Sequence, residues 1–215
     1  MRLRNIKNKE DIINNSKYII LNPEEYKGKW KSVFDNDNPI YIEIGMGKGK
    51  FIRDNALNNK DINYIGIEKY DTVIARSLKK IEDYNIPNLR ILRMDAGCLD
   101  KVFDSEIDLI YLNFSDPWPK DRHEKRRLTH SNFLSIYDKV FKSKNRIIMK
   151  TDNRGLFEYS VCSLSKYGYT IEKLNVDLHN SSETNIITTE YEDKFVSLGN
   201  PIYKDRKSTR LNSSH

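Results

Sequence analysis

The sequence predicts an α/β fold built on a doubly wound, mostly parallel sheet of the seven-stranded Rossmann-like type. From Pro39 onward, short β-rich runs alternate with helical runs. In addition, an acidic residue stands at or near the end of five of the short runs. Strands separated by helices of this length imply right-handed crossovers, and ligands of such sheets bind at the carboxyl ends of the strands.

Each expected element follows from its local pattern. Strands are expected at residues 40–44, 64–67, 89–93, 107–112, 146–150 and 169–176. Helices are expected at about 11–17, from a glycine turn to about 57, and at 71–83, 131–141 and 154–166. In the third of these helices Asp71 suits an N-cap, and Ile74, Leu78 and Ile81 share one face.

We expect an N-terminal arm at residues 1–39, one domain at 40–203, and a non-native or disordered tail at 204–215. The tail has no apolar period, and its four basic and one acidic side chains supply +3 of the formal charge of +6. Residues 1–203 therefore carry only +3, so charge alone is a weak indication of a polyanionic partner.

Composition narrows the class of protein. A length of 215 residues suits one domain with a sizeable core. No apolar run approaches the length of a membrane span, and the first residues have no signal-peptide pattern. Cys98 and Cys162 are far apart, which indicates a reduced, cytoplasmic protein. Four scattered histidines without a Cys/His cluster argue against a metal site.

A glycine turn follows the first expected strand, over residues 43–51. Gly45 and Gly47 allow the backbone to approach a ligand closely. The last position of the dinucleotide fingerprint is Lys50, whose bulk opposes close packing of helix on strand. The turn therefore fits a nucleoside ligand without a pyrophosphate better than NAD, although a simple tight connection has the same pattern.

Two carboxylates support a nucleoside ligand. Glu68 ends the second strand, where it can accept hydrogen bonds from both ribose hydroxyls. Asp95 follows the third strand, within reach of an adenine amino group. Acidic walls would also favour a positively charged sulfonium. For any single residue of this kind, helix capping is the alternative explanation.

The fourth strand leads into Ser115-Asp116-Pro117-Trp118-Pro119-Lys120, where two prolines hold Asp116 and Trp118 in an extended backbone. A stiff structural loop is the alternative. The next residues are strongly basic and favour contact with RNA phosphates, whereas a solvated charged surface is the simpler explanation of such a run taken alone.

These segments resemble the bacterial tRNA (guanine-N7-)-methyltransferases, which have the class I S-adenosylmethionine-dependent fold. The run from Asp116 to Arg127 carries the most specific part of the resemblance, which extends over about residues 40–201. The family usually has a further strand after the Gly-x-Pro at 199–201, so only Ile202 and Tyr203 are left for a truncated last strand.

The resemblance implies a role for each matching residue. S-adenosylmethionine would be the cofactor, and tRNA the partner. The cofactor-binding residues would be Glu43, Gly45, Gly47, Glu68, Asp95 and Asp116, with Asp116 also catalytic. The target guanosine would contact Lys120, Asp152, Thr189, Glu190, Tyr191 and Glu192. The basic run would hold RNA through Arg122, His123, Glu124, Lys125, Arg126 and Arg127. The variable loop would hold that guanosine, at tRNA position 46. Neither a membrane nor a metal is expected, and the sequence leaves monomer and homodimer open.

The chemistry suits these residues. Guanine N7 carries a lone pair and no proton, so its methylation needs positioning more than a strong base. Carboxylates such as Asp116 and Asp152 could stabilise the positive charge that develops on the ring. Three rivals remain open at this point: a methyltransferase acting on an exocyclic amine, an NAD-dependent oxidoreductase, and an RNA-binding module without activity. Arg2 and Arg4 of the arm could also touch RNA.

Overall fold

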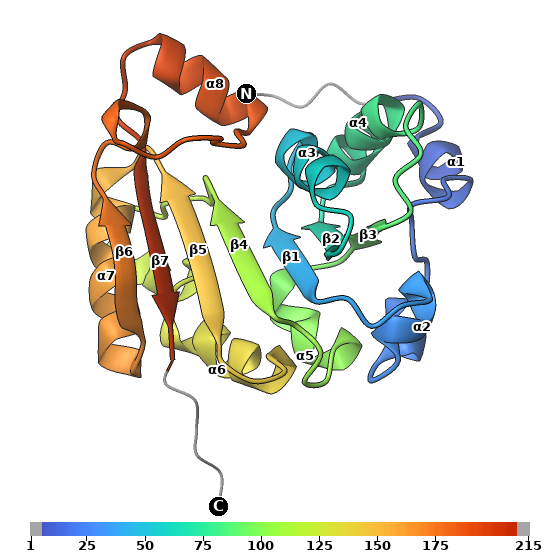
Figure 1. The fold of residues 1–215 in the computed structure, drawn as a ribbon, viewed down its shortest axis with the longest axis horizontal. Coiled ribbons are helices and arrows are strands. Elements are labelled where there is room, and N and C mark those ends of the chain that lie inside the picture. The colour runs from blue at the N-terminus through green and yellow to red at the C-terminus, as the bar shows by residue number, and fades with distance from the viewer. Residues whose placement is uncertain (1–5, 210–215) are drawn as a thin grey trace, which may run out of the picture.

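The computed structural model describes residues 6–209 and places seven strands in one sheet, in the order β3-β2-β1-β4-β5-β7-β6 (Figure 1). The strands are β1 (Ile40–Ile44), β2 (Asn63–Glu68), β3 (Leu89–Arg93), β4 (Leu109–Asn113), β5 (Arg146–Thr151), β6 (Thr170–Asn175) and β7 (Tyr203–Ser208). Strands β1 to β5 are parallel, and β7 is antiparallel to both neighbours. The predicted fold class is confirmed. The strand order reverses between β1 and β4, which is where such sheets bind ligands.

Helices cover both faces of the sheet, and each face has its own apolar core. One cluster joins the sheet to α1 (Lys9–Asn14), α3 (Lys50–Asn58) and α4 (Asp71–Ile81). The other joins it to α2 (Trp30–Phe34), α5 (Leu99–Val102), α6 (Ser131–Val140) and α7 (Arg154–Tyr167). The last helix, α8 (Glu190–Ser197), lies beyond the carboxyl ends of the strands (Figure 1).

Helix α4 has the predicted apolar face, because Ile74, Leu78 and Ile81 are buried. The predicted N-cap is wrong: the cap position is Tyr70, and Asp71 is the first residue of the helix. Asp71 instead forms ion pairs with Lys9 and Arg93, each at 3.6 Å. A carboxylate in the first helical turn still interacts favourably with the helix dipole.

The expected N-terminal arm is part of the domain over the residues that the structure describes. Tyr18 and Trp30 are buried, and the Trp30 indole donates to the carbonyl of Val102 at 2.9 Å. The backbone around Ile19 pairs with Ile91 along the outer side of β3, which is one of the two outermost strands of the sheet. The apolar residues of the expected arm are scattered and have no helical or strand period, so the sequence pattern did not predict this packing. Arg2 and Arg4 lie outside the described residues.

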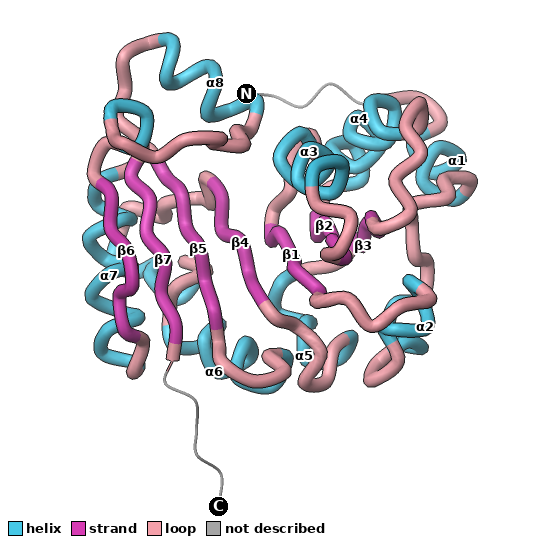
Figure 2. Tube along the Cα trace, in the orientation of Figure 1, coloured by secondary structure: helices cyan, strands magenta, loops and turns pink. Residues whose placement is uncertain are grey.

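The expected end of the fold at residue 203 is wrong, because residues 204–208 complete β7 between β5 and β6. The sequence pattern did not predict this strand because four of its six residues are charged. Asp205 and Lys207 are buried, with Lys207 Nζ 2.8 Å from Asp205 Oδ2. Lys204 and Arg206 point to the opposite face, where they pair with Glu183 and Glu172. A chain segment of 27 residues connects β6 to β7 and carries α8 across the carboxyl ends of the sheet (Figure 2).

Candidate active site

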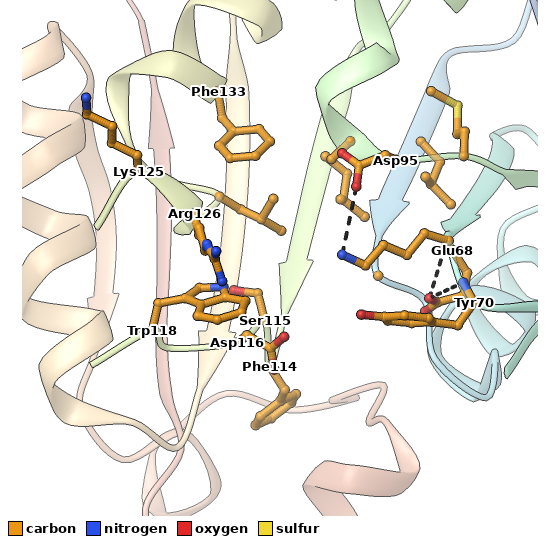
Figure 3. Close-up of a pocket in the computed structure, with 17 residues that line it drawn as sticks. Glu68, Tyr70, Asp95, Phe114, Ser115, Asp116, Trp118, Lys125, Arg126 and Phe133 are labelled. Atoms are coloured by element: carbon orange, nitrogen blue, oxygen red, sulfur yellow. Dashed lines mark hydrogen bonds and ion pairs between the residues drawn. The ribbon is translucent and has the colours of Figure 1, made fainter. Parts of the chain in front are cut away.

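The carboxyl ends of the strands surround a cavity of about 700 Å³. Four of the predicted cofactor-binding residues line it: Gly45, Glu68, Asp95 and Asp116. Figure 3 shows Glu68, Tyr70 and Asp95 on one side, with Trp118, Lys125, Arg126 and Phe133 on the other. Asp116 lies between the two sides, so the cavity joins an acidic wall to a cationic and aromatic wall.

The glycine turn requires its three glycines. Gly45, Gly47 and Gly49 all have positive φ, at 77°, 56° and 79°. At Gly49 a Cβ atom would collide with the Ser77 hydroxyl on α4, so this glycine provides the close packing of α3 on its neighbour. Lys50, which argued against NAD in the sequence, points elsewhere: its Nζ donates to Thr188 at 2.6 Å and pairs with Asp193 at 2.8 Å.

Glu68 is held at the end of β2 by backbone N–H groups. Its Oε1 accepts from Lys69 at 2.9 Å and Tyr70 at 3.1 Å, while Oε2 accepts from Gly47 at 3.3 Å. Burial raises the pKa of Glu68, and these backbone donors oppose that rise. Since each carboxylate oxygen has two acceptor sites, Oε2 keeps one for a ligand hydroxyl. Gly47 does not line the cavity and contributes through this bond.

Glu43 lies below the cavity and does not line it. Its side chain is only 1% exposed, and Oε1 accepts from Asn113 Nδ2 at 2.8 Å. Within the part of the chain that the structure describes, Oε2 has no hydrogen-bond partner. Burial raises the pKa of Glu43 to about 8. The carboxyl is therefore a buried acceptor held under the glycine turn, and the expected direct contact is not visible at the cavity wall.

Asp95 opens the short 3-10 helix Ala96–Cys98, where its Oδ1 accepts from the backbone of Gly97 at 2.8 Å. The side chain remains largely exposed, and Lys69 Nζ lies 3.8 Å from Oδ2 (Figure 3). An exposed pair at this distance has little strength. Asp95 can therefore accept a hydrogen bond from a ligand that enters the cavity.

Two residues with positive φ, Phe114 at 51° and Trp118 at 43°, bracket the Asp116 loop. Such angles are uncommon for bulky residues, and strained backbone of this kind clusters at functional sites. Phe114 N donates to the carbonyl of Lys150 on β5 at 2.8 Å, which holds the start of the loop. Asp116 itself is exposed toward the cavity (Figure 3). The prolines predicted the stiffness of this loop, whereas the strain was not evident from the sequence.

The basic run divides into two kinds of residue. The Arg127 guanidinium donates to the carbonyl of Trp118, at 3.0 Å from Nη2, and lies 4.2 Å from the ring of Tyr159. Arg127 therefore supports the loop from inside. Arg126 lies 4.8 Å over the Trp118 ring at the cavity wall, and Arg122, Glu124 and Lys125 are exposed. His123 is partly buried, with its ring 5.7 Å from that of Trp118.

The residues expected at the target guanosine do not form one cluster. Tyr191 donates to Asp152 Oδ2 at 3.2 Å, and its ring lies 5.0 Å from that of Phe114. Glu190 pairs with Lys80 on α4 at 2.7 Å. Lys120 is exposed at the start of the 3-10 helix Asp121–Arg126.

Thr189 and Glu192 have structural partners instead. They form a capping box on α8, where the Thr189 hydroxyl accepts from Glu192 N at 2.9 Å. Glu192 is fully buried and contacts Lys150 and His179. Both of these partners lie within the protein, and the expected contact of Glu192 with the target guanosine stays a prediction. The sequence contained the signal, because Thr-x-x-Glu is the pattern of a capping box. Lys150 and His179 were missed.

Among the described residues, no group of three or more His, Cys, Asp or Glu side chains could hold a metal ion. Within residues 6–209, no helix has the length and apolar character needed to cross a membrane.

Structures of similar fold are methyltransferases. An antibiotic-related methyltransferase matches with a TM-score of 0.63 at 18% identity, covering 86% of this chain and 94% of the other. The 16S rRNA (adenine(1408)-N(1))-methyltransferase from Catenulisporales acidiphilia matches with a TM-score of 0.62 at 13% identity, covering 91% and 96%. A variant of the latter was solved with its cosubstrate SAM. At these identities the likeness shows the fold alone.

Sequence relatives are far closer. A family model described as a putative methyltransferase matches residues 37–205. The tRNA (guanine-N(7)-)-methyltransferase of Bacillus subtilis is 52% identical, covering 95% of this chain and 97% of the relative. The enzyme of that name from Streptococcus mutans is 52% identical, with 95% and 98% covered. The one from Bacillus licheniformis is 51% identical, with 95% and 97% covered. The chain therefore belongs to the tRNA (guanine-N(7)-)-methyltransferase family.

Proposed function

We propose that this protein transfers the methyl group of S-adenosylmethionine to N7 of a guanosine in the variable loop of tRNA. One observation carries the proposal within the family: Asp116 stands between an acidic wall suited to a nucleoside and a cationic, aromatic wall suited to RNA. We place the reaction in the cytoplasm, on tRNA that has already been transcribed.

The acceptor groups of the cavity fit S-adenosylmethionine. Its volume of about 700 Å³ lies within the usual range for ligand pockets. Glu68 keeps an acceptor site for a ribose hydroxyl, and Asp95 is open to an adenine amine. Glu43 is buried two residues before Gly45, where a positively charged ligand group would favour its ionised form. The bound cofactor would supply a methyl group on a sulfonium, which attracts these carboxylates.

The protein needs to position the guanine rather than remove a proton from it. N7 already carries a lone pair, and alignment of reacting groups can contribute roughly 7–11 kcal/mol to lowering a barrier. Asp116 is placed to stabilise the positive charge that develops on the ring. Asp152, held by Tyr191, is placed to accept from the ring NH or the exocyclic amine. Lys120 and Glu190 are proposed to contact the rest of the nucleoside.

The exposed part of the basic run is proposed to hold the tRNA backbone. Arg122, Lys125 and Arg126 offer charge to phosphates, and Trp118 offers a ring on which a base can stack. Arg127 is proposed to act by holding the Trp118 carbonyl rather than by touching RNA.

Mass spectrometry tests the position of the methyl group. The purified protein is incubated with S-adenosylmethionine and an unmodified tRNA transcript, and the digested nucleosides are identified. We expect 7-methylguanosine, which is lost when the variable-loop guanosine of the transcript is replaced by adenosine. The rival methyltransferase would give a nucleoside methylated on an exocyclic amine, and that product would overturn the proposal. If the adenosine-substituted transcript still yields 7-methylguanosine, the methylated guanosine lies outside the variable loop, and that part of the proposal is rejected.

A further inference from the structure

A buried polar cluster joins the strand β5 to the segment between β6 and β7. It consists of Lys150, Glu192 and His179. Lys150 is 3% exposed and Glu192 is 0% exposed, and the two form an ion pair. His179 lies on the 3-10 helix Leu178–Asn180, with Nε2 2.9 Å from Glu192 Oε1. Because a carboxylate only accepts, the His179 ring nitrogen is the donor.

Both oxygens of Glu192 are engaged within the protein. Oε1 takes the bond from His179, and Oε2 takes those from Lys150 and from the backbone of Thr189 at 3.3 Å. Lys150 also donates to the carbonyl of Ile187 at 2.9 Å. Glu192 is 0% exposed and does not line the cavity, so a base in the cavity does not reach it in this arrangement.

The cluster controls the position of Tyr191, the neighbour of Glu192 on α8. Tyr191 contacts Asp152 through its hydroxyl and Phe114 through its ring. Phe114 begins the Asp116 loop, and its ring points toward the α8 segment (Figure 3). Phe114 N is bonded to the carbonyl of Lys150, the same residue that binds Glu192. Lys150 therefore contacts α8 through its side chain and the Asp116 loop through its backbone carbonyl.

Stability alone does not explain a buried ion pair with a partly buried histidine at this place. Removing two charges from water costs several kcal/mol for each ion, and a well-packed apolar pair of similar volume is often as stable or more stable. An apolar pair would lack the directional bonds that fix one orientation of α8, however. The polar cluster supplies those bonds from two directions, β5 and the helix that carries His179.

We propose that Lys150, Glu192 and His179 form a positioning network, which sets α8 so that Tyr191 packs against the Asp116 loop and orients Asp152. None of the three touches the substrate. The inference rests on the proposed function, since the groups being positioned are those assigned to the target guanosine.

Kinetics of His179 variants of the full chain test the network. His179→Ala removes the donor, and His179→Gln restores an amide donor at about the place of Nε2. Misplacement of a reacting group can lower turnover by as much as about 100-fold, so we expect His179→Ala to reduce kcat on unmodified tRNA by roughly 10- to 100-fold. We expect His179→Gln to recover most of it, and the dissociation constant of S-adenosylmethionine to stay within about twofold in both. Asn180→Ala, in the same short helix, is the matched control.

A second variant separates position from stability. Lys150→Met combined with Glu192→Leu replaces the ion pair by apolar groups, and we expect its thermal midpoint to stay at or above that of the wild type. Its kcat should nevertheless fall as in His179→Ala. A kcat within about twofold of the wild type in both variants, or a His179→Gln as slow as the alanine variant, would overturn the network.

Hydrogen exchange measured by mass spectrometry gives a readout that does not depend on methyl transfer. Amides of residues 188–197 should exchange faster in His179→Ala and in the double variant than in Asn180→Ala. Unchanged exchange would reject the network even if the wild type made 7-methylguanosine. Faster exchange in a protein that makes no 7-methylguanosine would uphold the network and reject the proposed function instead.

Discussion

The two sides of the sheet's carboxyl edge hold their carboxylates by different means. On the side of β1 to β3, Glu68 and Asp95 accept mainly from backbone N–H groups one or two residues further along the chain. On the side of β5 and β7, Glu192 and Asp152 are held by side chains 13 to 42 residues away. The first arrangement is a property of a turn, whereas the second exists only when distant segments have assembled.

The difference suggests a division of labour. A rigid local turn suits a cofactor that is the same in every catalytic cycle. The segment between β6 and β7, here called the cap, carries α8 and is assembled from distant parts of the chain. Such a cap suits a macromolecular substrate, because α8 and the Asp116 loop can be adjusted to it together. If this comparison is right, substitutions on the first side should change cofactor affinity, while substitutions on the second should change turnover or stability.

Asp116 lies where the two sides meet, so its loss should have the largest effect. We expect Asp116→Ala to lower kcat about 100- to 1,000-fold, as for other groups that stabilise transition-state charge, without lowering the thermal midpoint. Asp104→Ala, an exposed aspartate at the opposite edge of the sheet, is the control. Steady-state methyl transfer checks this, and near-normal turnover of Asp116→Ala would remove the residue from its role.

Glu68→Gln tests the cofactor side. The amide keeps the shape of the side chain but loses its charge, and hydrogen bonds to charged groups contribute about 1.5–3 kcal/mol. We expect the dissociation constant of S-adenosylmethionine to rise at least about tenfold in calorimetry, with tRNA affinity unchanged. Glu158→Gln on α7 serves as the control. An unchanged dissociation constant would mean that Glu68 only braces the turn.

The pair Asp205 and Lys207 tests the stability of the other side. Both side chains are fully buried, and neither has a well-aligned hydrogen bond among the described residues. Burial raises the pKa of Asp205 and lowers that of Lys207. We expect Asp205→Val combined with Lys207→Ile to increase the free energy of unfolding by at least about 1 kcal/mol in denaturant titrations. Lys207→Ile alone should destabilise the protein, because it leaves one buried carboxyl without its partner.

Glu43 gives a pH dependence of stability rather than a change in turnover. Its pKa is about 8 in the folded chain against an ordinary 4.5, so between these values the folded state holds a proton that the unfolded state has released. The free energy of unfolding should then fall as pH rises, by up to about 1.4 kcal/mol per pH unit. Glu43→Gln removes this titration and keeps the bond from Asn113, so its profile should be flatter over that window. Parallel profiles for wild type and variant would contradict the assignment.

Local patterns predicted the parallel half of the fold well. β1 and β3 have the predicted bounds, and β2 differs by one residue at each end. β4 begins two residues later than expected, because Ile107 pairs with Phe141 outside the strand. The prediction failed for β7, whose buried Asp205 and Lys207 break the apolar pattern that identifies an interior strand.

The candidate site divides in the same way. The turn, Glu68, Asp95 and Asp116 could be found because each lies at the end of a strand or within a few residues after it. Lys50, Lys150 and His179 could not, since their partners are fixed only by the path of the chain between β6 and β7. The resemblance pointed to Glu192, but its burial and its bonds to Lys150 and His179 were not evident from the sequence.

The insertion of β7 between β5 and β6 has a consequence for synthesis of the chain. Among the described residues β6 pairs only with β7, so it has no place in the sheet until residues 203–208 have been made. The cap that carries Tyr191 is tied at both ends to these two strands and cannot be seated earlier. The cofactor side can form while the ribosome is still translating, whereas the tRNA side is completed last.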